Sequence, residues 1–197
     1  WPPIDALGDV LSVPVGVLVQ TYVFDGTRVY SRYSPGYPLL LAGAMTIFGT
    51  HGAIYLNVAV LLALLGVLLV LGRRLLGDGV SAVVAVGLVL ACPTWVAMWA
   101  RSPLRDLPAH LAALVGLLLV ISAADTGRRA RWALAGVALG YAMSIRPDAL
   151  LYVPAAALVA VAIRRRRGVP QEGLLRPLGT VTLGIVVGLA PLLAYNA

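Results

Sequence analysis

Long apolar runs separated by short arginine clusters are the feature that most restricts how this chain can fold. Several runs approach 20 residues, and the 197-residue chain is 60% hydrophobic but only 12% charged. A soluble domain carries about a quarter charged residues, whereas about 20 apolar residues suffice for a helix to cross a bilayer. The sequence therefore predicts an all-α, polytopic bundle of transmembrane helices with an extracytoplasmic loop that carries juxtamembrane helices.

Six apolar runs are predicted to be membrane spans, and they divide the chain into two regions. Residues 1–53 form a first extracytoplasmic loop, and residues 54–197 form a bundle of about six spans. Because the chain starts at Trp1 without Met and stops just after an apolar run, we expect a fragment of a larger protein. The predicted spans are 54–71, 80–99, 107–124, 132–145, 149–163 and 178–195.

The first loop contains one helix that is too short to cross the membrane. Residues 1–35 are polar and rich in proline, which favours a loop with short interfacial helices or strand-like pieces. The turn Ser34-Pro-Gly-Tyr-Pro38 then starts a helix that stops at Gly49. About 10 to 12 residues reach roughly 15–18 Å, half of a ~30 Å hydrocarbon core. We therefore expect a juxtamembrane or re-entrant helix rather than a span.

The distribution of arginine predicts which loops face the cytoplasm. Loops 72–79, 125–131 and 164–177 hold ten arginines, and the alternate set, 1–38, 100–106 and 146–148, holds five. Basic residues concentrate in cytoplasmic loops, so the second set is expected outside. The arginines form neither one face nor a tail, so the net charge of +7 reflects topology, and we expect no nucleic acid partner.

The segment Arg101-Ser-Pro-Leu-Arg-Asp106 is the most charged stretch between two spans. Charges beside hydrocarbon are costly, and those that occur there are usually functional or paired. Asp106 opens a span, where the helix dipole favours a carboxylate. Two interpretations stay open: a helix cap paired with Arg105 or Arg101, and a catalytic base or metal ligand. His110 lies one turn further on, and we expect a satisfied or interfacial histidine rather than a metal ligand.

Three arginines are expected on the outer side, where positive charge is otherwise sparse. These are Arg101, Arg105 and Arg146. Guanidinium groups bind phosphate in a bidentate fork, so an anionic lipid headgroup is a natural ligand. The alternative is local pairing, of Arg105 with Asp106 and of Arg146 with Asp148.

Arg32, Tyr33 and Tyr37 flank the Pro-Gly turn. They are candidates for lining a sugar or headgroup pocket, and they are equally candidates for anchors at the membrane interface.

Two glycine motifs, Gly136-x-x-x-Gly140 and Gly184-x-x-x-Gly188, lie inside spans. Small residues at this spacing let helices approach closely, and we expect packing within one bundle rather than dimerisation.

Five segments, taken in order, resemble glycosyltransferases of the GT-C fold, which include protein mannosyltransferases and lipid A aminoarabinose transferases. The first is Tyr33-Ser-Pro-Gly-Tyr-Pro-Leu-Leu-Leu-Ala42, closed by Phe48-Gly49, and it is similar to the first-loop motif. The resemblance covers most of residues 30–197. The other segments are Leu71-Gly-Arg-Arg-Leu-Leu-Gly77, Arg101–Pro108, Gly136–Pro154 with Ser144-Ile-Arg-Pro147 at its centre, and Pro191–Asn196.

The resemblance implies a multi-pass enzyme of the plasma (inner) membrane with its active site facing outside. It would move a sugar from a polyprenyl-phosphate carrier to a lipid, glycan or protein acceptor among the membrane lipids. Asp106 matches the acid of the second outer loop and would be catalytic. The resemblance implies that Arg101, Arg105 and Arg146 contact the carrier phosphate, and that Tyr33, Tyr37 and Arg32 line the substrate site.

The chain departs from that pattern in two places. The family places an acid just after its first span, so we expect the principal base to precede Trp1. Some relatives have an acid and a lysine where this chain has Arg32-Tyr33, which leaves a divalent metal ion open as a cofactor. A transporter or flippase for a lipid-linked precursor, and a non-catalytic membrane subunit, are the alternatives. The spans lack the acidic or basic residues that transporters usually need.

Overall fold

Helices make up nearly all of the computed structural model, which describes residues 22–25, 28–31, 34–91, 105–168 and 175–196. The predicted all-α membrane helix bundle is confirmed. A short antiparallel hairpin, β1 (Tyr22–Asp25) and β2 (Arg28–Ser31), precedes the helices. The helices are α2 (Gly36–Phe48), η2 (Gly49–His51), α3 (Gly52–Leu76), α4 (Gly79–Leu90), α6 (Asp106–Thr126), α7 (Arg129–Ile145), η3 (Pro147–Leu151), α8 (Tyr152–Arg166), α9 (Leu175–Gly188) and α10 (Ala190–Asn196).

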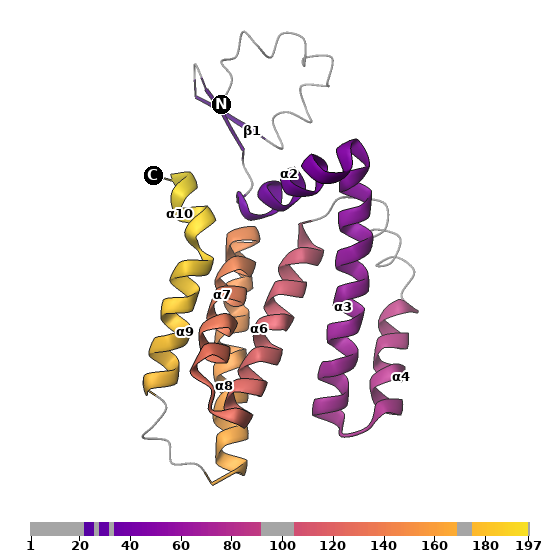
Figure 1. Cartoon of the computed structure of the whole chain (residues 1–197), viewed down its shortest axis with the longest axis vertical. Coiled ribbons are helices and arrows are strands. Elements are labelled where there is room, and N and C mark those ends of the chain that lie inside the picture. The colour runs from indigo at the N-terminus through magenta and orange to yellow at the C-terminus, as the bar shows by residue number, and fades with distance from the viewer. Residues whose placement is uncertain (1–21, 26–27, 32–33, 92–104, 169–174, 197) are drawn as a thin grey trace.

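The helix α2 lies across one end of the bundle, which is the upper end in Figure 1. It starts directly after Pro35 and stops where Gly49 adopts a left-handed φ of 62°. Glycine adopts this region without steric cost, so the chain turns there and continues through η2 into α3. The helix predicted from the Pro-Gly turn is therefore present, with the expected limits.

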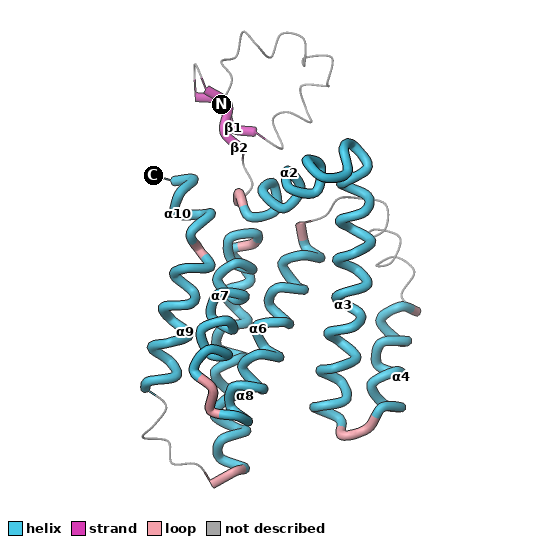
Figure 2. The backbone as a smooth tube through the Cα atoms, viewed as in Figure 1, coloured by secondary structure: helices cyan, strands magenta, loops and turns pink. Residues whose placement is uncertain are grey.

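The helices α3 and α4 form an antiparallel pair beside the rest of the bundle (Figures 1 and 2). Gly77 closes α3 at a φ of 83°, and its N–H donates to the carbonyl oxygen of Arg73 at 3.1 Å. Asp78 then caps α4, because its carboxylate accepts from the backbone N–H of Ser81 at 2.6 Å. The two helices touch closely, since a Cβ on Gly72 would lie 2.9 Å from the Cβ of Ala82.

The helices α7 and α9 pack backbone against backbone through the two glycine motifs. A Cβ added to Gly136 or Gly140 would collide with the carbonyl oxygen of a residue on α9. Gly184 and Gly188 meet carbonyl oxygens of α7 in the same way. The motifs therefore serve contact within one chain, as expected, and Leu139 fills the space beside Gly116 on α6.

The outer surface of the helices is apolar, as a bilayer requires. Exposed leucine, isoleucine and valine side chains cover α3, α4, α8 and α9, with examples at Ile54, Val80, Leu158 and Leu183. Such a continuous apolar surface marks contact with lipid or protein rather than water. Within the described residues, four helical stretches are long and apolar enough to cross a membrane: Gly52–Leu76, Asp106–Thr126, Pro147–Arg166 and Arg176–Tyr195.

Asp125 joins three helices at the end of the bundle opposite α2. Its carboxylate contacts Arg167 after α8 at 2.8 Å and Arg74 at the end of α3 at 3.8 Å. The Arg167 side chain also donates to the carbonyl oxygen of Asp125 at 3.1 Å. The loops that hold most of the arginines therefore lie together at one end.

Candidate functional site

Asp106 and Arg146 meet at the end of the bundle beneath α2, although 40 residues separate them in sequence. Asp106 is the first residue of α6, and Arg146 follows the last residue of α7. Pro147 excludes Arg146 from helical backbone, and its φ of −138° and ψ of 117° are extended. This change of direction brings the Arg146 guanidinium between two carboxylates.

Arg146 is the centre of a three-residue charge cluster with Asp106 and Asp148. Its Nε and Nη2 bind the two carboxylate oxygens of Asp148 at 2.8 Å and 2.6 Å, which is a bidentate fork. Its Nη1 binds Oδ1 of Asp106. The hydrogen bond to Asp148 raises the pKa of Arg146 above its ordinary value, and the nearby charge of Asp106 adds to the effect.

Two members of the cluster, Arg146 and Asp148, line a groove between α6, η3 and α8, and Asp106 adjoins this groove through its contact with Arg146. The groove has a volume of about 360 Å³ and combines an apolar wall with three polar side chains, those of His110, Arg146 and Asp148. Ligand sites of this size are typically apolar with a few convergent polar groups. The remaining lining comes from Ala109, Ala149, Leu151, Tyr152 and Ala155.

His110 is held by the helix backbone rather than by the Asp106 carboxylate. Its Nδ1 lies 2.6 Å from the carbonyl oxygen of Asp106, and its ring meets Tyr152 edge to face at 6.1 Å between centroids. The histidine thus has a partner and forms part of the groove wall. Among the described residues, no group of three His, Cys, Asp or Glu side chains is placed to hold a metal ion.

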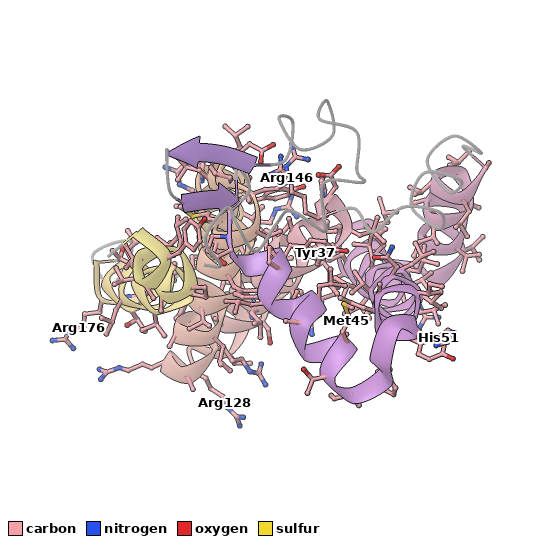
Figure 3. The ribbon with its side chains drawn as sticks, turned by 90° about the horizontal axis from the view of Figure 1, so that it is seen from above. Tyr37, Met45, His51, Arg128, Arg146 and Arg176 are labelled. Carbon is pink, nitrogen blue, oxygen red and sulfur yellow. The ribbon has the colours of Figure 1, made fainter. Side chains whose placement is uncertain are left out.

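The start of α2 is fastened onto the same end of the bundle. The Tyr141 hydroxyl donates to the carbonyl oxygen of Gly36 at 3.0 Å. A Cβ at Gly36 would lie 2.6 Å from Oγ of Ser144, so only glycine fits against α7 here. Figure 3, which views the molecule from this end, shows the start of α2 at Tyr37 and its far end at Met45.

Tyr37 is buried between α2, α6 and α7, where it packs against Ala109 and Ile145. Only 9% of the residue is exposed, and its hydroxyl has no hydrogen-bond partner among the described residues. Burial raises the pKa of this phenol. A buried hydroxyl without a partner is uncommon, and each instance requires an explanation, such as a ligand or water.

The structure places some of the predicted site residues and not others. Asp106 and Arg146 are brought together, and Tyr37 packs against Ala109 of α6 and Ile145 of α7. Arg105 precedes α6 at the same end, half-buried, and its charge acts on Asp148. The predicted local pairing of Arg146 with Asp148 is present, with Asp106 as a second partner. Arg32, Tyr33 and Arg101 lie outside the described residues.

Two further residues shape the site and were not predicted to do so. Tyr141 and Ser144 hold the Pro-Gly turn against α7, and Oγ of Ser144 donates to the carbonyl oxygen of Tyr141 at 2.7 Å. The sequence signal was an aromatic and a hydroxyl residue just before Arg146-Pro147. Their partner is 105 residues away in the chain, so local sequence could not identify it.

The fold and this site define a polytopic membrane protein with a charge cluster and an adjacent groove at one end of its helix bundle. The sequence profile of the dolichyl-phosphate-mannose-protein mannosyltransferase family matches residues 32–195. The chain belongs to this family of membrane glycosyltransferases of the GT-C kind. Comparisons with curated proteins and with solved structures gave no match.

Proposed function

We propose that this chain takes part in transferring a sugar from a polyprenyl-phosphate carrier to a lipid, glycan or protein acceptor on the extracytoplasmic face of the plasma (inner) membrane. Membership of the family supports glycosyl transfer. The observation that carries the proposal for the site is the meeting of Asp106 and Arg146 beside the groove of about 360 Å³. The groove is large enough for a sugar and its phosphate.

Asp106 is proposed to act as the base. It takes the proton from an acceptor hydroxyl while that oxygen forms a bond to the anomeric carbon of the sugar. The bond between the anomeric carbon and the phosphate oxygen breaks at the same time, and the polyprenyl phosphate leaves with the electron pair. The reaction is therefore a direct displacement and needs no nucleotide.

Arg146 is proposed to stabilise the leaving phosphate, where negative charge develops. Its planar guanidinium suits a phosphate, and Asp148 already holds it in a fixed orientation. Arg101 and Arg105 are proposed as further contacts to the same phosphate.

Tyr37 is proposed to line the substrate site together with Arg32 and Tyr33. Its buried hydroxyl, which has no partner among the described residues, supports a contact with a bound sugar or phosphate. The fastening of Gly36 to Tyr141 keeps Tyr37 at this place. A rigid support of this kind is what a positioning residue requires.

The test is a transfer assay with the intact protein in membrane vesicles. A labelled polyprenyl-phosphate sugar is supplied, and release of the sugar from its carrier is followed for wild type and Asp106→Asn. We expect release by wild type and a loss of at least about 100-fold in the variant. Asp125→Asn is the matched control, since it makes the same change in the last turn of the same helix.

Each other outcome has a defined meaning. Binding of the carrier without release in either protein contradicts transfer from that donor and favours a transporter or flippase. Equal release by both proteins keeps the enzyme but removes Asp106 from its proposed role. Equal losses in Asp106→Asn and Asp125→Asn point to a general effect of charge on the helix.

A further inference from the structure

A second groove lies at the end of the bundle opposite Asp106, between the ends of α6 and α8 and the starts of α7 and α9. It has a volume of about 390 Å³. Four arginines line it, Arg129, Arg164, Arg167 and Arg176, together with Trp132 and Thr180. This groove has no part in the proposed sugar transfer, because α6 separates the two sites by its full length.

The groove has a surplus of positive charge among the described residues. Asp125 is the one carboxylate in its described lining, so four arginines against one acid leave three positive charges. Asp125 is also already engaged, with Arg167 at 2.8 Å and with Arg74 from outside the groove at 3.8 Å. The described lining therefore holds more guanidinium groups than carboxylates, which favours the binding of an anion, and Arg129 and Arg176 are the two arginines tested below.

The floor of the groove is rigid. Trp132 is 4% exposed and belongs to the main core cluster with Ala123, which is fully buried. The turn beside it is fixed by Gly127, which has a φ of 68° and donates its N–H to the carbonyl oxygen of Ala123 at 2.8 Å. The arginines therefore project from a packed base rather than from a loose loop.

The position of the groove along the bundle matches the level of lipid headgroups. α6 has 21 residues from Asp106 to Thr126, so it is about 30 Å long, close to the thickness of a hydrocarbon core. The groove thus lies at the membrane face opposite the charge cluster of Asp106, which is the proposed cytoplasmic face. Further along, α8 and α9 expose Leu158, Leu178 and Leu183, a surface suited to acyl chains.

We propose that this groove binds a phosphate group, supplied as the headgroup of an anionic phospholipid. Guanidinium groups bind phosphate in a fork, and basic pockets between transmembrane helices on the cytoplasmic side are typical headgroup sites. Arg176 extends outward from α9 to the periphery of the bundle in Figure 3. The proposal does not depend on the sugar-transfer activity.

The test measures lipid binding by the purified, delipidated, intact protein. Phosphatidylglycerol, phosphatidylcholine and inorganic phosphate are titrated separately, and bound lipid is counted by native mass spectrometry. Arg129→Gln/Arg176→Gln is compared with Arg128→Gln/Arg166→Gln. Both pairs remove two charges at the same end, but Arg128 and Arg166 are exposed residues outside the described lining of the groove.

We expect saturable binding of phosphatidylglycerol to wild type and binding on the order of tenfold weaker in the groove variant. The control variant is expected to bind within about twofold of wild type. Arg129→Lys/Arg176→Lys, which keeps the charge but loses the fork, is expected to be intermediate. If the glutamine variant fails to fold, this lysine variant still tests whether the groove binds the headgroup.

Three results would overturn the proposal. Equal weakening in the groove and control variants would show non-specific attraction to a basic surface. Equal binding of phosphatidylcholine and phosphatidylglycerol would remove the role of the anionic headgroup. The third result has two parts: phosphate binds saturably to the lipid-free protein, and phosphate displaces no bound lipid. That result would assign the groove to a soluble anion.

Discussion

The two ends of α6 carry the same chemistry in opposite proportions. At the end beneath α2, one arginine is held between two carboxylates, Asp106 and Asp148. At the other end, one carboxylate is held between two arginines, Arg74 and Arg167. Both arrangements place a carboxylate beside a guanidinium group, and they differ in which of the two groups is shared by two partners. An ion pair alone therefore does not distinguish the proposed active site from the other end of α6. The two ends differ in the number of carboxylates relative to guanidinium groups in each set of ion pairs.

Among the further variants that compare the two ends of α6, Arg146→Lys has the largest expected effect. A lysine keeps the charge but cannot hold Asp148 in a bidentate fork or present a planar fork to phosphate. We expect kcat/KM for sugar release to fall by about 100-fold, the typical cost of one lost donor to developing charge. Arg167→Lys makes the same change at the other end and is expected to stay within about threefold of wild type. Similar losses in both variants would erase the distinction between the ends.

The second effect is on stability and tests how α2 is fastened. In Gly36→Ala the new methyl group meets Oγ and the carbonyl oxygen of Ser144 at 2.6 and 2.7 Å. We expect a loss of about 1–3 kcal/mol, which is typical of overpacking, measured by thermal unfolding in detergent. Gly43→Ala is the control on the same helix, since its Cβ would meet nothing within 4 Å. An unchanged unfolding temperature in Gly36→Ala would show that α2 is not held there.

A smaller effect is expected from Asp125→Asn. This change weakens the pairs with Arg74 and Arg167, whose side chains are 42% and 52% exposed. Partly exposed pairs contribute about 1 kcal/mol or less, and salt screens them. We expect a small loss of stability that fades at high ionic strength. A loss of several kcal/mol would mean that this end, and not the other, holds the bundle together.

The smallest effect concerns Asp78, the cap of α4. Its hydrogen bond from the backbone N–H of Ser81 lowers the pKa of the carboxyl. A lowered pKa stabilises the fold above the unfolded value of about 3.9, and this contribution is lost as pH falls through the folded value. Asp78→Asn keeps a capping side chain, so the variant is expected to unfold with a slightly flatter acid dependence. An identical pH profile would remove this role.

Helix positions followed from the sequence because apolar runs and glycines fix them locally. The predicted runs 54–71 and 107–124 lie inside α3 and α6, which extend them by a few residues at each end. The limits of α2 followed from Pro35 and Gly49. The glycine motifs were recognised as packing sites, but the pairing of α7 with α9 required the fold.

The sequence drew attention to Asp106 and Arg146, but the contact between them depends on the fold. Asp106 and Arg146 stood out as charges at the ends of spans, and local reasoning left open whether Asp106 is a cap paired with Arg105 or Arg101 or a catalytic base or metal ligand. The structure shows a partner that is distant in sequence, because the adjacent helices α6 and α7 bring the first turn of α6 beside Arg146, which directly follows α7. The roles of Tyr141 and Ser144 depend on contacts over more than 100 residues, which no local pattern encodes.

The hydrogen count of Arg146 has a consequence for how a ligand would arrive. A guanidinium carries five N–H groups, and the bonds to Asp106 and Asp148 occupy three of them among the described residues. Two N–H groups remain for an incoming phosphate oxygen. The phosphate of the sugar donor could therefore bind while both carboxylates stay bound to Arg146. In the proposed mechanism, arrival of the carrier would therefore require no exchange of partners at Arg146, and the guanidinium would keep the same orientation in the empty and the loaded site.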